Sequence, residues 1–319
     1  MSSELLRHQL QGNLGPGLRI EHELGEGGMS RVFAARQGDP PRDVVVKVLD
    51  PELAKAVDIE RFRREIQVAA HLRHPGIVPV IEACQTGTLL YYTMPMVRGD
   101  TLRAVLHRTG PLAVREALDY VEEIGAALAC AHAHNVVHRD IKPENILVAD
   151  GHAVVTDFGI ARAIEHAADL ASVTSTGLTV GTPRYMSPEQ AAADKRIDGR
   201  SDIYSLACVL YEMLAGEPPF PGNNTRLLLA RHMHQDPPRI TVVRPDVPAH
   251  VEAALLKALQ KIPAARFATV EEFLAALGAG SLEPAPRRGA GRMRRAAIVG
   301  AALALAAAVG VLIARAVGG

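Results

Sequence analysis

The sequence has no excess of charge of either sign, and it has few cysteines. Each of these features excludes some classes of protein. Lysine plus arginine and aspartate plus glutamate number 35 each, so no overall field attracts nucleic acid or another charged partner. The three cysteines, Cys84, Cys130 and Cys208, are odd in number, far apart and without metal-ligand spacing. We therefore expect reduced thiols in a buried setting, not disulfides or a zinc site.

The N-terminus also lacks the apolar stretch of a signal peptide, and residues 1–16 are expected to be a tail. The opposite end differs, because residues 296–314 run without a charge or a hydroxyl group. A helix of this length, at about 1.5 Å per residue, matches the thickness of a bilayer core. Five arginines lie in the preceding linker, 281–295. Their bias predicts a cytoplasmic main body and an extracytoplasmic tail, 315–319. A buried, alanine-rich helix of a soluble domain is the alternative interpretation.

The rest of the chain changes character near residue 98. Short strand-like runs bounded by Gly, Pro and Asp fill residues 17–98, interrupted by one amphipathic helix that begins near Asp58. Helical periodicity dominates residues 99–280, where one segment, 200–216, is almost wholly apolar. The pattern predicts an α+β chain with a small strand-rich lobe, a larger helical lobe, a linker and a membrane span.

Two features of the small lobe suit a bound phosphate. Gly25, Gly27 and Gly28 lie between two strand-like runs, where glycines let backbone N–H groups approach phosphate oxygens. No Gly-Lys-Ser/Thr follows, so this is not a Walker loop, and an ordinary hairpin turn is the alternative. Lys47 interrupts a run of valines, where it either snorkels at a sheet edge or meets a counter-charge. Glu65 on the following helix could supply that charge.

The stretch HRDIKPEN gathers polar groups between two apolar runs. Asp140, Lys142 and Asn145 lie in it, and Pro143 favours a loop over a helix. Asp157 ends the next strand-like run. Oxygens of Asp and Asn from neighbouring loops suit Mg²⁺, which commonly keeps nucleotide phosphates as further ligands. A solvated turn explains either segment alone, but not both in this order downstream of the glycines and the lysine.

Taken together, these motifs resemble those of the protein kinases, specifically the bacterial, membrane-anchored, eukaryotic-like serine/threonine kinases. GEGGMSRV, VVVK, HRDIKPEN, DFG and SPE occur in the family's order over roughly residues 17–278. The resemblance implies the two-lobed protein kinase fold, with residues 17–98 as the N-lobe and hinge and 99–280 as the C-lobe. It also implies ATP and Mg²⁺, with Mn²⁺ as an alternative, and transfer of the γ-phosphoryl group to protein Ser or Thr hydroxyls.

The resemblance assigns roles to particular positions. Asp140 would accept or orient the proton of the substrate hydroxyl, and Lys142 would contact the γ-phosphate. Lys47 would hold the α- and β-phosphates and pair with Glu65. Asn145 and Asp157 would bind the metal. The nucleotide would lie among residues of the glycine loop and of both lobes: Leu24, Gly25, Glu26, Gly27, Gly28, Val32, Val45, Met94, Met96 and Leu147.

Further positions would regulate or anchor the kinase. Arg139 resembles the arginine that binds an activation-loop phosphate, and Thr174 and Thr176 resemble autophosphorylation sites. Five other positions are assigned less central roles: Arg162 as a second cation for that phosphate, Thr182 as the partner of Lys142, and Asp202 with the Glu189–Arg266 pair as structural anchors. Ser30, Ser187 and Val45 depart from the family pattern without removing a charged or metal-binding group.

Two rival functions remain at this stage. A membrane-tethered pseudokinase acting as a scaffold is disfavoured because Lys47, Asp140, Asn145 and Asp157 are all present. A small-molecule kinase is disfavoured by Lys142 and by the threonine-rich segment before GTPRYMSPE. Small residues at four-residue spacing in 296–314 suggest a homodimer through the membrane, a pattern that also arises by chance in an alanine-rich segment.

Overall fold

The computed structural model describes residues 3–13, 17–27, 30–50, 54, 59–87, 89–160 and 183–278. The chain divides into two compact units, Met1–Gly280 and Ser281–Gly319. The second unit, with the expected linker 281–295, span 296–314 and tail 315–319, lies outside the described residues. Among the helices that are described, none combines the length and the apolar character needed to cross a bilayer.

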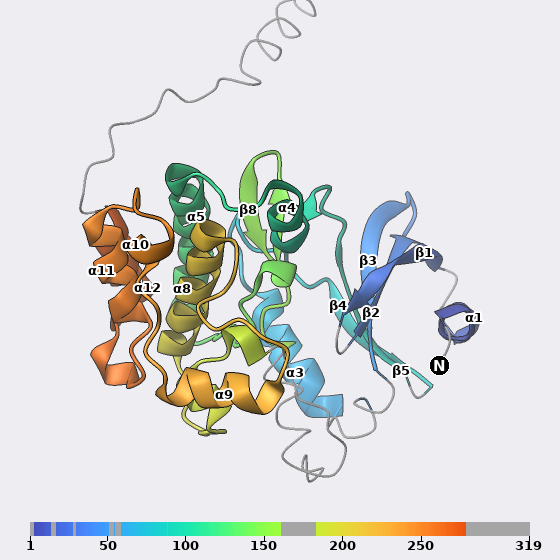
Figure 1. Cartoon of the computed structure of the whole chain (residues 1–319). Helices are drawn as coiled ribbons and strands as arrows, with labels where there is room; N and C mark the ends of the chain where they lie inside the picture. Colours follow the sequence, from blue (N-terminus) through green and yellow to red (C-terminus); the bar gives the residue numbers. More distant parts are fainter. Residues whose placement is uncertain are drawn as a thin grey trace, which may run out of the picture. The chain divides into compact units, whose positions relative to one another are not determined.

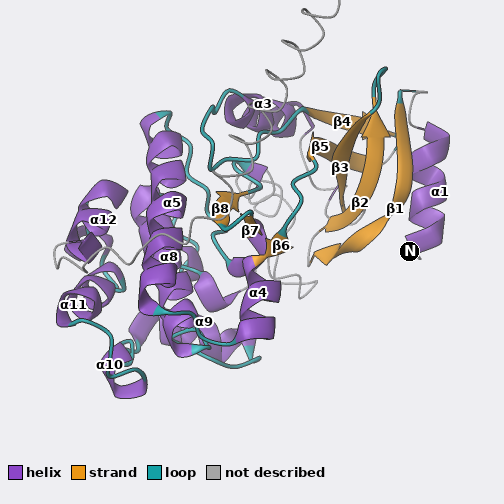
Figure 2. Cartoon of the chain, turned by 90° about the horizontal axis from the view of Figure 1, so that it is seen from above, coloured by secondary structure: helices purple, strands orange, loops and turns teal. Residues whose placement is uncertain are grey.

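The small lobe is built on a five-stranded antiparallel sheet in the order β1-β2-β3-β5-β4. Figure 2 shows this sheet on one side of the described chain and the helices of the large lobe on the other. Its strands are β1 (Leu18–Gly27), β2 (Ser30–Gln37), β3 (Arg42–Leu49), β4 (Glu82–Thr86) and β5 (Leu89–Pro95). The short strand β4 was not predicted from the sequence.

The two faces of the sheet have separate apolar cores, because side chains alternate along a strand. Val44, Val46 and Val48 of β3 face one core, whereas Val45 and Leu49 face the other. Helix α3 (Ile59–Ala70) packs into the second core through two fully buried residues of its inner face, Phe62 and Ile66.

Helix α1 (Ser3–Asn13) covers the other face of the sheet (Figure 1). Its Leu6 and Leu10, one helical turn apart, join the core that contains Phe33 and Val46. Residues 3–13 were expected to be part of a tail. Instead they supply a buried apolar stripe to the small lobe.

The large lobe is mainly helical and is organised around α8 (Gly199–Ala215), in which residues 201–214 are all buried. Asp198 caps its N-terminus and Gly216, at a φ of 86°, ends it in the left-handed conformation. The other helices are α4 (Leu102–Thr109), α5 (Val114–Ala133), α7 (Pro188–Ala191), α9 (Thr225–His234), α10 (Ile240–Val243), α11 (Ala249–Ala258) and α12 (Val270–Gly278).

The large lobe also contains short strands and 3₁₀ turns, which lie next to the predicted site residues in the sequence. A three-stranded sheet joins β6 (Asp100–Thr101), β7 (Ile146–Ala149) and β8 (His152–Val155). Three 3₁₀ turns complete the lobe: η1 (Pro143–Asn145), η2 (Pro183–Tyr185) and η3 (Pro263–Ala265). The predicted α+β, two-lobed arrangement is confirmed.

Backbone and side-chain contacts tie these parts together. The segment between α3 and β4 pairs with β8, because the N–H of Val78 donates to the carbonyl of Val155 (2.9 Å) and the N–H of Val155 donates to that of Gly76 (2.8 Å). The predicted anchor of the large lobe is confirmed. Arg266 donates two hydrogen bonds of 2.7 Å to the buried carboxylate of Glu189, which is the bidentate geometry that makes such pairs strong.

Candidate active site

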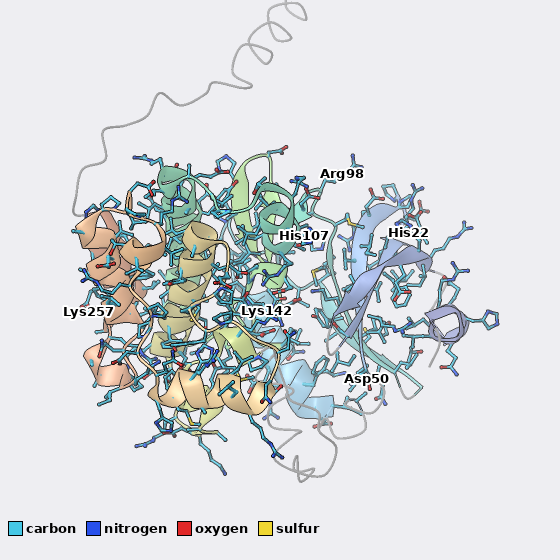
Figure 3. The ribbon with its side chains drawn as sticks, viewed as in Figure 1. His22, Asp50, Arg98, His107, Lys142 and Lys257 are labelled. Carbon is cyan, nitrogen blue, oxygen red and sulfur yellow. The ribbon has the colours of Figure 1, made fainter. Side chains whose placement is uncertain are left out.

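The loop of residues 138–145 brings three predicted site residues into direct contact. The Nζ of Lys142 donates to Oδ2 of Asp140 at 2.7 Å, and Nδ2 of Asn145 donates to the same oxygen at 2.9 Å. Nδ2 of Asn145 also donates to the carbonyl of Asp140 at 2.8 Å. In Figure 3, Lys142 lies between the helical lobe and the sheet, whereas Lys257 lies at the far side of the helical lobe. The loop therefore presents a carboxylate and an ammonium side by side.

The buried carboxylate of Asp202, on α8, holds this loop in place. Asp202 is fully buried and accepts hydrogen bonds of 2.8 Å from the backbone N–H groups of His138 and Arg139, and another of 2.8 Å from His132. Burial disfavours the charged form of Asp202, but the hydrogen bond and charge of His132 outweigh it, and the pKa of Asp202 lies below its usual value. The predicted anchoring role of Asp202 is confirmed.

Arg139 has an unusual backbone that these contacts keep in place. Its φ is 67°, in the left-handed region that costs a residue with a side chain free energy. Asp202 accepts from its N–H, and Nε2 of Gln190 donates to its carbonyl at 2.7 Å. Because the N–H and the carbonyl of Arg139 are both hydrogen-bonded, the backbone that leads into Asp140 is held in one conformation.

Asp157 connects the two lobes at the end of β8. Its Oδ2 accepts from the Nζ of Lys47 at 2.5 Å, and its Oδ1 accepts from the hydroxyl of Tyr92 at 2.8 Å. The Lys47 and Asp157 side chains are only 15% and 12% exposed. Burial opposes ionisation of Asp157, yet Lys47 and then Tyr92 overcome it and hold its pKa below the usual value.

The predicted pairing of Lys47 with Glu65 is not what the described residues show. The ion pair of Lys47 is with Asp157. Lys47 lies on β3 and Asp157 lies two residues after β8, and a largely buried ammonium needs such a counter-charge. Glu65 itself is half-buried on α3.

The residues after Asp157 dock against both lobes. Phe158 is buried and its ring meets that of His138 edge-on, with centroids 4.6 Å apart. Gly159 has a φ of 77°, and a Cβ built on it would lie 3.1 Å from the Cβ of Ala69 on α3. A glycine is therefore required there on two grounds, conformation and space.

The glycine-rich stretch forms a β-hairpin. Gly25 lies opposite Val32 and Gly27 lies opposite Ser30 in the β1–β2 register. A Cβ added at Gly25 would meet no protein atom within 4 Å, so packing inside the protein does not explain the glycine. The backbone there is open to an approaching group. Gly28 and the side chain of Glu26 lie outside the described residues.

Most of the residues predicted to surround adenine belong to one apolar cluster. Val45 and Met94 are buried in it, and Val32, Met96 and Leu147 pack against it. Leu147 comes from β7 of the large lobe, so the cluster includes residues from both lobes. The sixth residue, Leu24, is 49% exposed and is not part of the cluster.

The predicted regulatory threonines cannot be placed. Thr174 and Thr176, with Arg162 and Thr182, lie in residues 161–182, outside the described part of the chain. Arg139 is the one predicted regulatory residue whose position the structure gives.

The chemistry of the donors fits a divalent metal ion. Both N–H groups of the Asn145 amide are engaged with Asp140, so its oxygen is the atom that can bind a cation. Asp157 contributes an ionised carboxylate. One amide oxygen and one carboxylate, joined by nucleotide phosphates, form the hard-oxygen ligand set that Mg²⁺ prefers.

Comparison with known proteins identifies the family. The family described as "Protein kinase domain" matches residues 18–275. The chain belongs to this family. ATP and a divalent metal ion are the substrate and cofactor that kinases of this family use.

Named relatives agree with this assignment. Over 270 residues the chain is 44% identical to the serine/threonine-protein kinase PknB of Mycolicibacterium smegmatis, covering 82% of this chain and 43% of that one. It is 40% identical over 278 residues to PknA of Mycobacterium tuberculosis, covering 84% and 63%. The crystal structure of the M. tuberculosis PknI kinase domain, a cysteine-to-alanine mutant, matches with a TM-score of 0.67 at 31% identity and covers 85% of this chain and 98% of that one. The chain therefore spans less than half of the length of its PknB relative.

Sequence reasoning missed two polar side chains at the site. Tyr92 resembles any core tyrosine of a strand, and nothing in its neighbours indicates a contact with Asp157. Arg103 of α4 binds Glu144 of the loop (2.8 Å) and Glu212 of α8 (2.6 Å), and also donates to the hydroxyl of Tyr185. It joins the loop to α8, but its sequence context is that of an ordinary surface helix.

Proposed function

We propose that this protein is a serine/threonine protein kinase that transfers the γ-phosphoryl group of ATP to Ser or Thr hydroxyls of proteins, including its own. The observation that carries the proposal is the convergence of Lys47 and Asp157, 2.5 Å apart, from different lobes. Lys142 and Asn145 contact Asp140 on the neighbouring loop. A phosphate-binding cation, a metal-binding carboxylate and a hydroxyl-orienting carboxylate thus lie in one folded unit.

Each residue has a distinct task in this reaction. Lys47 holds the α- and β-phosphates, and the glycine hairpin offers backbone N–H groups to the phosphate chain. Asp140 accepts a hydrogen bond from the substrate hydroxyl and orients it, while Lys142 places positive charge beside the γ-phosphate. Asn145 and Asp157 hold Mg²⁺ or Mn²⁺, which neutralises phosphate charge when bound. The apolar cluster around Met94 receives adenine.

The rival functions have less support. A pseudokinase scaffold lacks a supporting observation, because the lysine, both carboxylates and the asparagine of an active kinase are all present. The small-molecule kinase has no specific observation in its favour.

The first test is loss of phosphoryl transfer in Asp140→Asn. The full chain is incubated with γ-labelled ATP, Mg²⁺ and a protein substrate. Because the amide is a poor acceptor for the substrate proton, we expect at least about a hundredfold slower labelling, the range of general-base losses. Asp119→Asn, an exposed change on α5, is the control and should label normally. Nucleotide binding without labelling in the wild type would favour the pseudokinase.

Activation by autophosphorylation is part of the proposal. Arg139 lies beside Asp140 and its guanidinium is suited to a phosphothreonine, so a phosphate on Thr174 or Thr176 would draw the 161–182 segment toward the 138–145 loop. In the same labelling reaction, mass spectrometry should find phosphate on these two threonines in the wild type and none in Asp140→Asn. Label confined to other positions would remove them from the proposal.

Anchoring in the cell membrane is the second part of the proposal. It rests on the uncharged run 296–314 and the five arginines before it. The kinase lobes then face the cytoplasm, with a single pass and residues 315–319 outside. Pairing of two chains through the small residues of 296–314 stays a prediction, which a cross-linking comparison of the full chain with a Gly300→Leu variant would check.

A further inference from the structure

Tyr92 reaches the metal ligand Asp157 from the centre of the small-lobe sheet. It lies on β5 directly opposite Lys47 of β3 in the antiparallel register. Opposite residues of such a pair project from the same face of the sheet. The two side chains therefore leave the sheet together, and each ends on a different oxygen of one carboxylate, the Nζ of Lys47 on Oδ2 and the hydroxyl of Tyr92 on Oδ1.

The hydroxyl of Tyr92 is a fixed, neutral donor. Its residue is 2% exposed and packs in the core with Phe62 and Ile66 of α3, so its ring is held. A phenol keeps its proton at neutral pH, because its ordinary pKa is about 10. An ionised carboxylate can only accept, so the phenol donates the proton of this 2.8 Å hydrogen bond.

Asp157 needs a side-chain partner of this kind. Its φ of 69° lies in the left-handed region. A residue with a side chain adopts this conformation at a cost in free energy, so surrounding contacts must hold it there. Lys47 holds one oxygen now, but in the kinase reaction the same ammonium serves the phosphates. The hydrogen bond from Tyr92 involves no phosphate-binding group, and Oδ2 would be the oxygen that Asp157 offers to a metal ion once Lys47 binds the phosphates.

We propose that Tyr92 is a positioning residue for the metal site, its hydroxyl fixing Oδ1 of Asp157 so that the carboxylate is presented to the divalent ion in one orientation. The inference rests on the proposed kinase function for the identity of the metal ligand. It differs from a packing role, because the packed ring only carries the hydroxyl, and the hydroxyl oxygen makes the contact with Asp157.

The test removes that oxygen alone, by Tyr92→Phe in the full chain. Tyr91→Phe is the matched control: Tyr91 is the preceding residue of β5, is 7% exposed, and packs in the core on the opposite face of the sheet. Mn²⁺ is titrated by electron paramagnetic resonance in the presence of a non-hydrolysable ATP analogue. The affinity for the analogue is measured separately in EDTA, and thermal unfolding is recorded for all three proteins.

We expect Tyr92→Phe to bind Mn²⁺ about tenfold more weakly, as when partners of metal ligands are removed elsewhere. Its affinity for the analogue in EDTA should stay within about twofold of the wild type, and Tyr91→Phe should match the wild type in both measurements. Equal Mn²⁺ affinity in Tyr92→Phe and wild type would overturn the proposal. A loss of analogue binding in EDTA that equals the loss of Mn²⁺ binding would also do so, because it indicates general damage.

The outcome is separable from the kinase proposal. If the wild type labels no protein but its Mn²⁺ affinity depends on the Tyr92 hydroxyl, the kinase function fails and the positioning role stands. If the wild type labels protein and Tyr92→Phe retains full Mn²⁺ affinity, the positioning role fails and the kinase function stands. A wild type that binds no Mn²⁺ overturns the positioning role.

Discussion

At the scale of single residues, the His132–Asp202 pair makes the support of the 138–145 loop depend on pH. Burial opposes protonation of His132, but the Asp202 carboxylate more than compensates and raises the pKa of His132. The stabilisation from charged His132 is therefore complete below the unfolded histidine pKa of about 6.5 and is lost as pH rises through the higher folded value. The lowered pKa of Asp202 has the opposite sign: its contribution is present above about pH 3.9 and fades as pH falls through the folded value.

His132→Gln isolates this effect, since the amide can still donate a neutral hydrogen bond. We expect the difference in free energy of unfolding between wild type and His132→Gln to be about 1 kcal/mol larger at pH 5.5 than at pH 8.5, the margin between charged and neutral hydrogen bonds. Urea unfolding at the two pH values measures it. His134→Gln, at the exposed end of the same helix, is the control. A difference that does not change with pH would show that His132 stays neutral in the fold.

The residue scale also shows what motifs can and cannot predict. The loop that contains Asp140, Lys142 and Asn145 was predicted from Pro143 and from the clustered polar residues, but the contacts among the three side chains were not. The partner of Lys47 depends on how β3, α3 and β8 are placed in space. The spacing of motifs along the sequence does not predict that placement. Tyr92 was missed for the same reason, because its hydroxyl acts on a residue 65 positions away.

At the scale of elements, α1 is a structural part of the small lobe. Leu10 is fully buried between α1 and the sheet. Leu10→Ala should lower the free energy of unfolding by about 2–3 kcal/mol, as expected for a buried leucine. His8→Ala, on the exposed side of the same helix, should change it by less than about 0.5 kcal/mol. Chemical denaturation measures both. An unchanged midpoint in Leu10→Ala would mean that α1 separates from the sheet before the lobe unfolds.

Helices and strands were predictable from the sequence where their apolar pattern extended over many residues or where glycine and proline marked their ends. Strand β2 follows from a short run bounded by glycine and proline, and α8 follows from a long segment that is almost wholly apolar. Strand β4 is only five residues long and includes the polar residues Glu82 and Gln85, and Gly87 marks only its C-terminal end. Among the side chains of α1 that the structure describes, two leucines are buried, and such a short stripe cannot be interpreted until the sheet face that it covers is known.

At the scale of the whole molecule, membrane insertion of residues 296–314 is the main prediction. The run is rich in alanine, so its insertion is marginal and one charge should abolish it. An arginine at the centre of a span costs about 2.5–3.5 kcal/mol. We expect the full chain to resist extraction from membranes by alkaline carbonate, Leu305→Arg to be released, and Leu305→Ile to be retained. Release of the wild type would favour the buried soluble helix instead.

The close approach of Gly159 to Ala69 has a consequence for inhibitors of this protein. A Cβ at Gly159 would lie only 3.1 Å from the Cβ of Ala69, so α3 and the Asp157–Gly159 segment are expected to move together. A compound that wedges behind Lys47 and pushes the helix outward must also carry away the carboxylate on which the divalent ion depends. Such a compound would compete with the metal without ever touching its ligands.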